Sequence, residues 1–249
     1  MISPHEVLPG DPLVTWMVSR ADFEAGPTAI PAIAAGRNVA WLGRATRPGE
    51  RWVTGMGEEP AEIVRLVERL AAEHDVDGVT VPEDAFDGLP ARLKSPDPGL
   101  WCLWTLPPDQ ARLQASSAIR LSPEDERIDD LLAHSSSAHV FRGDPRVVRW
   151  AGIERDGRLA AVAGQIAEAS GAAHLVSVCT HPDFRGRGLA SQVCSRIMAD
   201  AIEDGAPMLV LEMYSANESG RRVYARLGFT ECGRYASGLL APALPTVRS

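Results

Sequence analysis

Hydrophobic residues recur at helix and strand spacings, most clearly in the second half of the chain. Leu189, Val193, Ile197 and Ala201 follow one another every four residues and predict the buried stripe of a helix from about Gly188 to Glu203. Apolar and alternating runs predict strands at 118–121, 146–153, 159–167, 174–180, 208–213 and 230–239. This half therefore has the pattern of a mixed α/β domain.

Turn and cap residues divide these elements. Asp156-Gly157 predicts a hairpin between two strands. Ser122, followed by a proline and two acids, predicts the start of a helix that runs to about Ala133. The polar loop HSSSAHVFRGDP comes next. Asn217 predicts the cap of a second helix, and Gly228 predicts its left-handed end.

The first half has a weaker pattern of the same kind. Strands are expected at 39–44, 51–54, 78–81 and 100–106, and a short helix at 83–93. A longer amphipathic helix is expected at 59–74, with an apolar side formed by Ile63, Leu66, Val67 and Leu70. The order strand, helix, strand, helix, strand repeats that of residues 172–239. We therefore expect a degenerate internal duplication, with domains at 1–112 and 117–249.

One segment joins a strand to a helix through a glycine-containing loop, Val178-Cys179-Thr180-His181-Pro182-Asp183-Phe184-Arg185-Gly186-Arg187-Gly188-Leu189-Ala190-Ser191. Successive backbone N–H groups and a helix N-terminus bind phosphate oxygens without a lysine. Gly186 and Gly188 allow close approach of a ligand, and Arg185 and Arg187 supply charge-assisted contacts. Neither GxxxxGK[ST] nor GxGxxG is met, so the P-loop and the Rossmann fingerprint are excluded.

This segment resembles the acyl-CoA-binding motif of the GNAT superfamily, [RQ]-x-x-G-x-[GA], which stands here as Arg185-Gly186-Arg187-Gly188-Leu189-Ala190. A second segment, Asn217-Glu218-Ser219-Gly220-Arg221-Arg222-Val223-Tyr224-Ala225-Arg226-Leu227-Gly228-Phe229, resembles the family's later motif, N-x-x-[AG]-x-x-x-Y-x-x-x-G-F. The resemblance covers residues 118–240. It implies an α/β protein (α+β mixed sheet), with a GNAT fold in the C-terminal half. The N-terminal half would be a smaller, degenerate GNAT-like α/β domain.

The resemblance also implies how acetyl-CoA is held. The sheet would open between the strands at 174–180 and 208–213, and the pantetheine arm would pair with backbone groups of the first strand. The pyrophosphate would lie on the loop, and Asn217 would contact the cofactor near the pantetheine. The cofactor-binding residues expected on this basis are Val178, Cys179, Thr180, Arg185, Gly186, Arg187, Gly188, Leu189, Ala190, Ser191 and Asn217.

Two residues carry the expected chemistry of amine acylation. Tyr224 stands at the motif position of the family's usual acid for the leaving thiolate; packing beneath the loop is the alternative. Glu212 is a carboxylate in an apolar strand, where burial would strengthen it as a base; a solvated strand end is the alternative. Leu211-Glu212-Met213 with Asn217 and Tyr224 resembles the ribosomal-protein N-terminal acetyltransferase branch. Tyr214-Ser215-Ala216 departs from that branch, which leaves a peptide substrate in doubt.

Other candidates are weaker. His174 and His181 flank the same strand and are expected to be surface or loop-packing residues. His134 and His139 lie in the polar loop that is expected to cover the acceptor site. Cys179 is expected to be a small strand residue rather than a nucleophile. The acceptor is expected to be a small-molecule amine, with protein N-terminal or lysine acetylation and a non-catalytic acyl-CoA-binding module as the other readings.

Composition narrows the partners. The net charge of −8 argues against nucleic acid, and no run of apolar residues is long enough to span a membrane. Four cysteines without a CxxC pair fit neither a zinc site nor a disulfide framework, so we expect no metal and reduced thiols. The first residues do not resemble a signal peptide. A cytoplasmic enzyme is therefore expected, and a homodimer is left open.

Overall fold

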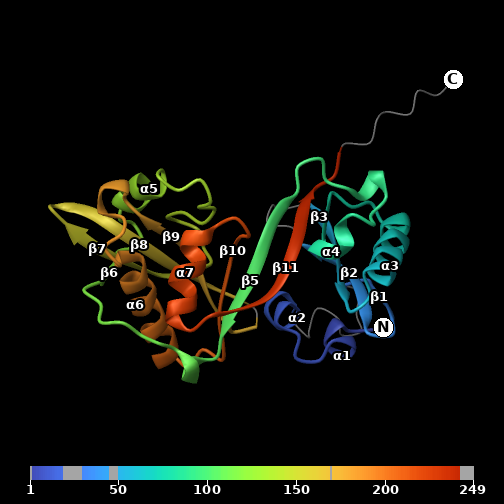
Figure 1. Ribbon diagram of the computed structural model, residues 1–249, viewed down its shortest axis with the longest axis horizontal. Helices are drawn as coiled ribbons and strands as arrows, with labels where there is room; N and C mark the ends of the chain where they lie inside the picture. Colours follow the sequence, from blue (N-terminus) through green and yellow to red (C-terminus); the bar gives the residue numbers. More distant parts are fainter. Residues whose placement is uncertain (1, 19–29, 45–49, 169, 242–249) are drawn as a thin grey trace. The chain divides into compact units, whose positions relative to one another are not determined.

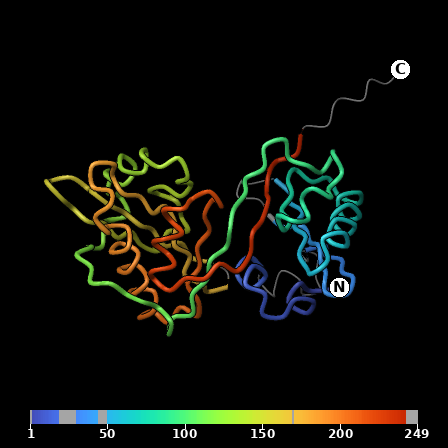
Figure 2. The backbone as a smooth tube through the Cα atoms, viewed as in Figure 1, coloured from blue at the N-terminus to red at the C-terminus, as the bar shows by residue number. Residues whose placement is uncertain are grey.

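The computed structural model describes residues 2–18, 30–44, 50–168 and 170–241 (Figure 1). It contains two compact units. Unit 1 comprises the chain up to Cys102 together with the chain from Gly233 onward, and unit 2 comprises Leu103–Cys232. Two long strands, β5 (Gly99–Leu106) and β11 (Thr230–Leu239), belong partly to each unit, and their course can be followed in Figure 2. The domain limits expected from the sequence, 1–112 and 117–249, stay a prediction.

Unit 1 is a small mixed sheet with helices. Its strands lie in the order β1-β2-β3-β4-β11. The β3–β4 pair is parallel, and the β1–β2, β2–β3 and β4–β11 pairs are antiparallel. The elements are α1 (Pro4–Val7), α2 (Pro12–Met17), β1 (Ala32–Ala35), β2 (Asn38–Arg44), β3 (Arg51–Gly57), α3 (Pro60–Glu73), β4 (Gly78–Pro82) and α4 (Glu83–Phe86).

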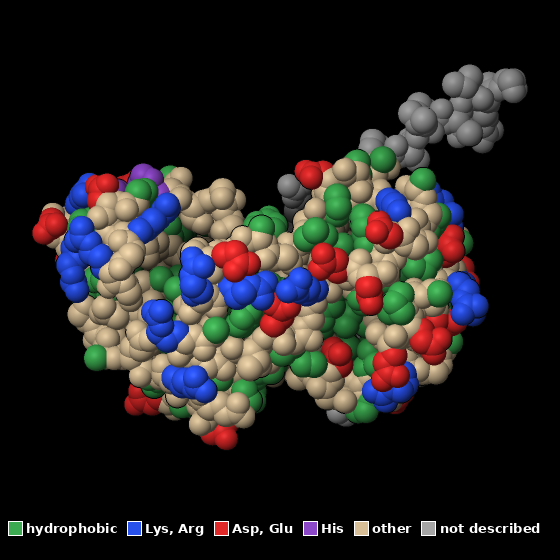
Figure 3. All heavy atoms as spheres, viewed as in Figure 1, with side chains coloured by type: hydrophobic (Ala, Val, Ile, Leu, Met, Phe, Trp, Pro, Cys, Tyr) green, Lys and Arg blue, Asp and Glu red, His purple; other side chains and the backbone are tan. Residues whose placement is uncertain are grey.

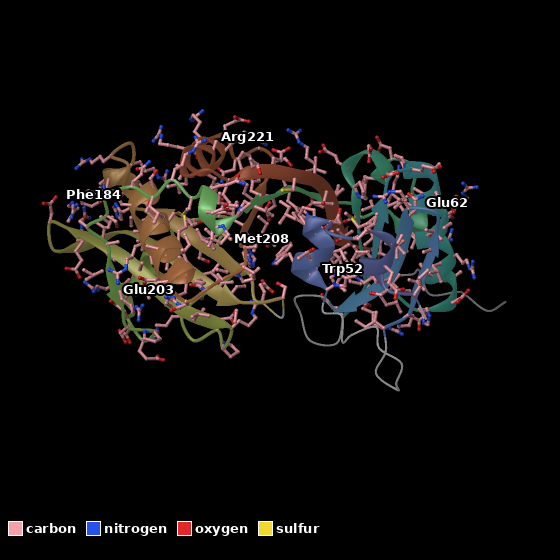
Figure 4. The ribbon with its side chains drawn as sticks, turned by 90° about the horizontal axis from the view of Figure 1, so that it is seen from below. Trp52, Glu62, Phe184, Glu203, Met208 and Arg221 are labelled. Carbon is pink, nitrogen blue, oxygen red and sulfur yellow. The ribbon has the colours of Figure 1, made fainter. Side chains whose placement is uncertain are left out.

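Helix α3 packs on one face of this sheet as its apolar pattern predicts. Its buried residues Ile63, Leu66, Val67 and Leu70 belong to one core with β3 and β4. A Cβ at Gly55 would lie 2.5 Å from Val67, so only glycine allows this approach. In Figure 4 the labelled Glu62 marks α3, and Trp52 marks β3. The Trp52 indole N–H donates to the Thr80 hydroxyl at 2.7 Å.

Unit 2 is a larger mixed sheet in the order β5-β10-β9-β8-β7-β6. Strands β6 to β9 form successive antiparallel pairs, and β9 and β10 are parallel with α6 as their crossover. Its remaining elements are β6 (Ile119–Leu121), α5 (Arg127–Leu132), β7 (Val147–Arg155), β8 (Arg158–Ala167), β9 (Ala173–Thr180), α6 (Leu189–Glu203), β10 (Leu209–Tyr214) and α7 (Glu218–Leu227). The repeat of element order between the two halves is thus present in the structure.

Most element predictions are confirmed. The α6 stripe is buried along its length, and Asp156 and Gly157 form the hairpin turn with φ of 53° and 73°. Gly228 ends α7 with φ of 104°. Three short elements, α1, α2 and β1, were not predicted.

Two helix predictions were wrong in extent: one helix begins later than expected, and the other is interrupted. The helix expected from Ser122 begins only at Arg127. Ser122 instead closes a turn, because its backbone carbonyl accepts from Asp125 N and its hydroxyl from Glu124 N. The helix expected at 83–93 is two pieces, α4 and a 3₁₀ turn at Ala91–Leu93, with Pro90 as the N-cap of the second piece.

The segment between β5 and β6, residues 107–118, forms hydrogen bonds with two helices of unit 2, and we call it the strap. Arg112 N donates to Leu227 O at the end of α7. Gln114 N donates to Ser195 Oγ, and Ser116 Oγ donates to Gln192 O, both on α6. These bonds hold in place the two helices that carry the predicted motifs.

An ion-pair cluster ties α6 to the strands. The largely buried Asp200 accepts from Arg120 at 3.1 Å and from Arg196 at 3.0 Å, and Arg149 lies 3.7 Å away. Burial raises the pKa of the Asp200 carboxyl, but the hydrogen bonds from Arg120 and Arg196 outweigh burial and leave that pKa below its ordinary value.

We expect Asp200→Asn to lower the free energy of unfolding by about 2 kcal/mol at pH 7, because it removes the carboxylate that accepts charge-assisted hydrogen bonds from Arg120 and Arg196. Since the folded-state pKa is lowered, this stabilisation is present above the unfolded pKa of about 4 and is lost as pH falls through the folded-state value. Urea unfolding at pH 7 and pH 3.5 measures the difference. Glu154→Gln, in an exposed pair with Arg127, is the control and should cost less than about 1 kcal/mol. Equal losses in both variants would contradict the assignment.

Candidate active site

The sheet of unit 2 opens between β9 and β10. These strands pair only at Leu209↔Ala173 and Val210↔His174, although β9 continues to Thr180 and β10 to Tyr214. Beyond the paired residues, this edge of β9 has backbone N–H and C=O groups with no paired strand beside them. An extended ligand with amide groups can use such an edge as an added strand would. The opening lies where the sequence predicts it.

A β-bulge shapes the open part of β9. Val162 pairs with Cys179 and Gly164 with Val176, so β9 has one residue more than β8 over this stretch. Ser177 takes up the extra residue with φ of 50°. As a result Val176 and Cys179 both point into the same core, while Val178 and Thr180 stay half-buried. The sequence offered no sign of this bulge, because serine is not a residue that requires positive φ.

The loop after β9 leads into the N-terminus of α6 in the predicted way. Gly186 and Gly188 have φ of 75° and 74°, and Gly188 is the N-cap of α6. The first backbone hydrogen bond into the helix runs from Gln192 N to Gly188 O. The N–H groups of Leu189, Ala190 and Ser191 therefore have no helical acceptor, as in any first turn. The loop and helix start therefore have the free donors that an anion site needs.

Two buried hydroxyl oxygens beside this loop fit a polar ligand. Thr180 Oγ1 and Ser191 Oγ have no hydrogen-bond partner among the described residues. Buried hydroxyls without a partner are rare, because desolvation costs about 1–3 kcal/mol each. Both residues were predicted to bind the cofactor. The donor set of this loop therefore fits a phosphate-bearing ligand.

The two arginines of the loop fold back on it. Arg185 Nε donates to Thr180 O at 3.2 Å, and Arg187 Nη2 donates to Asp183 O at 3.1 Å. Arg187 also lies over the Phe184 ring, 5.3 Å from its centroid. Each guanidinium has five N–H donors, so these bonds orient the charge and leave donors for an anion.

Glu212 lies in the part of β10 that extends beyond its pairing with β9. Burial alternates along β10, with Leu211 and Met213 buried and Glu212 and Tyr214 more exposed. The Glu212 side chain is 30% exposed, so it is less enclosed than its apolar strand suggested. Its Oε1 lies 3.7 Å from Nε2 of His139, which comes from the polar loop after α5. The sequence placed His139 near the acceptor site but did not link it to Glu212.

The polar loop is anchored at two residues that follow His139. Ser177 Oγ donates to Val140 O at 2.7 Å, which ties the loop to the bulge. Arg142 donates to both carboxylate oxygens of Asp129, through its backbone N–H and its Nε. His139 is therefore held beside β10 by the bulge in β9.

Charged groups lie near His139 and Glu212. Asp144 accepts two hydrogen bonds from Arg146, which lower the pKa of the Asp144 carboxyl and raise that of Arg146. Glu168 and Glu212 further raise the Arg146 pKa through their charges. The buried His174 places Nδ1 2.7 Å from Glu168 Oε1. His174 is thus a buried residue within hydrogen-bond distance of Glu168 rather than a surface residue.

Tyr224 lies inside α7 and is buried. Its ring packs edge-on against Phe229, with 6.0 Å between centroids. Burial, and then the charge of Cys194, raise the pKa of Tyr224 well above its ordinary value. No hydrogen bond joins Tyr224 to Glu212 in the described part of the chain.

Asn217 begins α7 as predicted. Its Oδ1 accepts from Gly220 N at 2.9 Å, which satisfies one of the free donors of the helix start. Arginines make α7 basic, and blue side chains gather over it in Figure 3. Arg221 lies over the Trp104 ring and pairs with Glu231.

The remaining candidates are structural. His181 accepts from Asp183 N, and its ring contacts His134 with 4.7 Å between centroids. This confirms His181 as a loop-packing residue. Burial raises the pKa of the Cys179 thiol, which fits a strand residue and not a nucleophile.

The matching loop of unit 1 is built differently. Between β3 and α3 the chain reads Gly57-Glu58-Glu59-Pro60. Asn38 Oδ1 accepts from Glu59 N at 2.9 Å, and Pro60 has no N–H. The carboxylates of Glu58 and Glu59 repel an anion, and the Glu59 N–H is already used, so unit 1 has no phosphate cradle at this place.

The described ranges contain no group of three or more His, Cys, Asp or Glu side chains that could hold a metal ion. No helix within them has the length and apolar character that a membrane span needs.

Residues 111–229 match the model of the acetyltransferase (GNAT) family. No match was found among curated protein sequences.

Three solved structures resemble the chain. A GNAT-family protein of Novosphingobium aromaticivorans is 22% identical with a TM-score of 0.55, over 77% of this chain and 84% of that one. A GCN5-related N-acetyltransferase of Kribbella flavida is 18% identical with a TM-score of 0.55, over 86% and 90%. A tandem GNAT protein from the clavulanic acid biosynthesis pathway is 14% identical with a TM-score of 0.51, over 90% and 87%. At these identities the likeness supports the fold. Together with the family match, it shows that residues 111–229 form an acyltransferase domain of the GNAT family.

Proposed function

We propose that the protein transfers an acetyl group from acetyl-CoA to the primary amine of a small molecule. The observation that carries the proposal is the opening between β9 and β10. A phosphate-binding loop follows one of these strands, and Glu212 lies on the other. The members of the GNAT family generally use acetyl-CoA, and the loop 185–191 has the donors that its pyrophosphate needs.

Each residue group would have a separate task. The free edge of β9 around Val178 and Thr180 would bind the amides of the pantetheine arm. The backbone of 186–191 and Asn217 would complete the cofactor contacts. The thioester carbon would then lie in the opening and face the acceptor amine.

Glu212 would remove a proton from the attacking amine as the new C–N bond forms. The C–S bond then breaks, and the leaving thiolate takes a proton or a hydrogen bond. Tyr224 would supply it, because a phenol with a raised pKa stays protonated at neutral pH.

Unit 1 would be a degenerate GNAT-like unit. Its strand order and the parallel β3–β4 pair match those of unit 2, and the tandem GNAT neighbour offers a precedent for such a chain. In unit 1, Glu58 and Glu59 stand before α3 where unit 2 has the glycine-containing loop before α6. The unit would therefore serve structure or acceptor contacts rather than bind the cofactor.

The proposal is tested by incubating the protein with acetyl-CoA and a panel of small amines and peptides while following thiol release. Acetylation of small amines with saturation kinetics supports it. Turnover on peptide N-termini or lysines alone would move the function to protein acetylation. Acetyl-CoA binding without turnover on any acceptor would favour a binding module, and absence of binding by calorimetry would overturn the proposal.

We expect one acetyl-CoA to bind per chain, because only unit 2 has the cradle. Isothermal titration gives this stoichiometry directly. Glu58→Gln should leave both affinity and stoichiometry unchanged, since its exposed carboxylate pairs with Arg37 in unit 1. A stoichiometry of two would show that unit 1 also binds the cofactor.

A further inference from the structure

Two segments of unit 2 present matching side chains beside the opening. On β10, Glu212 and Tyr214 lie on the same face because they are two residues apart, and the Tyr214 side chain is exposed. On the polar loop, Val140 is fully buried while His139 and Phe141 on either side of it are exposed. The contact between His139 and Glu212 brings the two segments together. Each segment thus offers one polar and one aromatic side chain.

The polar pair is suited to an N–H donor. His139 Nδ1 lies 3.3 Å from Ser137 O. A carbonyl only accepts, so Nδ1 carries the proton. The His139 Nε2 atom faces the Glu212 carboxylate at 3.7 Å, which is longer than a hydrogen bond, so both atoms can take a further polar partner. A group with at least two N–H donors, such as a primary amine, can bond to both.

The aromatic pair is suited to an apolar body. Phe141 and Tyr214 are each about half exposed in unit 2. A single exposed aromatic residue needs no explanation. Here, however, each aromatic residue lies two positions after a member of the polar pair, Phe141 after His139 and Tyr214 after Glu212.

Resting on the proposed function, we propose that the acceptor is an apolar or aromatic primary amine. Its nitrogen would lie between Glu212 and His139, and its hydrocarbon body would lie against Phe141 and Tyr214. His139 would contact the substrate directly and determine affinity for the amine. Phe141 and Tyr214 would determine specificity for the body.

The test compares three primary amines, namely 2-phenylethylamine, hexylamine and ethanolamine, in the thiol-release assay, with each rate referred to the concentration of unprotonated amine. We expect kcat/KM to be at least about tenfold higher for the two apolar amines than for ethanolamine. Phe141→Ala and Tyr214→Ala should raise KM for 2-phenylethylamine several-fold, leave its kcat unchanged and hardly affect ethanolamine. Tyr214→Phe should behave as the wild type, because the ring is retained.

Two further variants separate the parts of the proposal. His139→Ala should raise KM for all three amines, because the nitrogen contact is common to them. Leu113→Ala removes an equally exposed apolar side chain from the strap of unit 2 and is the matched control; it should change nothing.

Equal kcat/KM for ethanolamine and 2-phenylethylamine, or unchanged KM in both aromatic variants, would overturn this inference while leaving the N-acetyltransferase standing. Failure of the protein to bind acetyl-CoA would overturn the proposed function instead.

Discussion

Replacing Gly188 by alanine should weaken acetyl-CoA binding at least about tenfold, whereas the same change at Gly205 should leave binding unaltered. Both glycines flank α6 with nearly equal φ, 74° and 81°, and an added Cβ meets no atom within 4 Å at either one. The backbone strain is therefore the same, about 1–2 kcal/mol. Only at Gly188 does that strain act on the donors of the phosphate loop. A methyl group there also stands where the backbone must approach the ligand.

Isothermal titration measures the affinity, and thermal unfolding of both variants measures the strain. We expect similar losses of stability and a loss of affinity in Gly188→Ala alone. An unchanged, wild-type affinity in both variants would mean that this loop does not hold the pyrophosphate. Equal losses of affinity would mean that α6 acts through general stability.

The features that the sequence predicted best depend on residues close together in the chain. A loop with two left-handed glycines and the amphipathic helix after it are local structures, so the pattern at 178–203 sufficed to predict them. The side of β10 that carries Glu212 follows from strand alternation. The helix cap at Asn217 follows from its own side chain and Gly220 N.

The missed features depend on distant residues or on unusual backbone. His139 and Glu212 are far apart in sequence, and their contact depends on Ser177 holding Val140. Nothing in the sequence marks Ser177 as a bulge. The short α2 is held by packing of Leu13 and Val14, which are fully buried, rather than by a long periodic pattern.

Strand pairing was the other limit. The last strand leaves unit 2 after Cys232 and pairs with β4 of unit 1, with Tyr235 opposite Pro82 and Leu239 opposite Gly78. Strand β5 passes in the other direction and lies next to β10. An apolar run predicts that a strand exists, but its partner is chosen by packing on the sheet.

Replacing Glu212 by glutamine should lower kcat by about 10²–10⁴-fold and leave acetyl-CoA affinity unchanged. Glutamine keeps the shape of the side chain but cannot take the proton of the amine. Glu154→Gln, on β7 and paired with Arg127, is the matched control and should keep the full rate. Single-turnover measurements at saturating acetyl-CoA separate this loss from a binding defect.

Tyr224→Phe tests the other end of the reaction. The phenyl ring keeps the contact with Phe229, so stability should change little, while loss of the hydroxyl should slow turnover about tenfold or more. Because burial raises the pKa of Tyr224, its ionisation should not limit the rate below about pH 10. If the base and the acid act in the same step, the double variant should lose less than the product of the single losses. Full activity in both single variants would show that amine deprotonation and thiolate departure depend on other groups, even with the cofactor site intact.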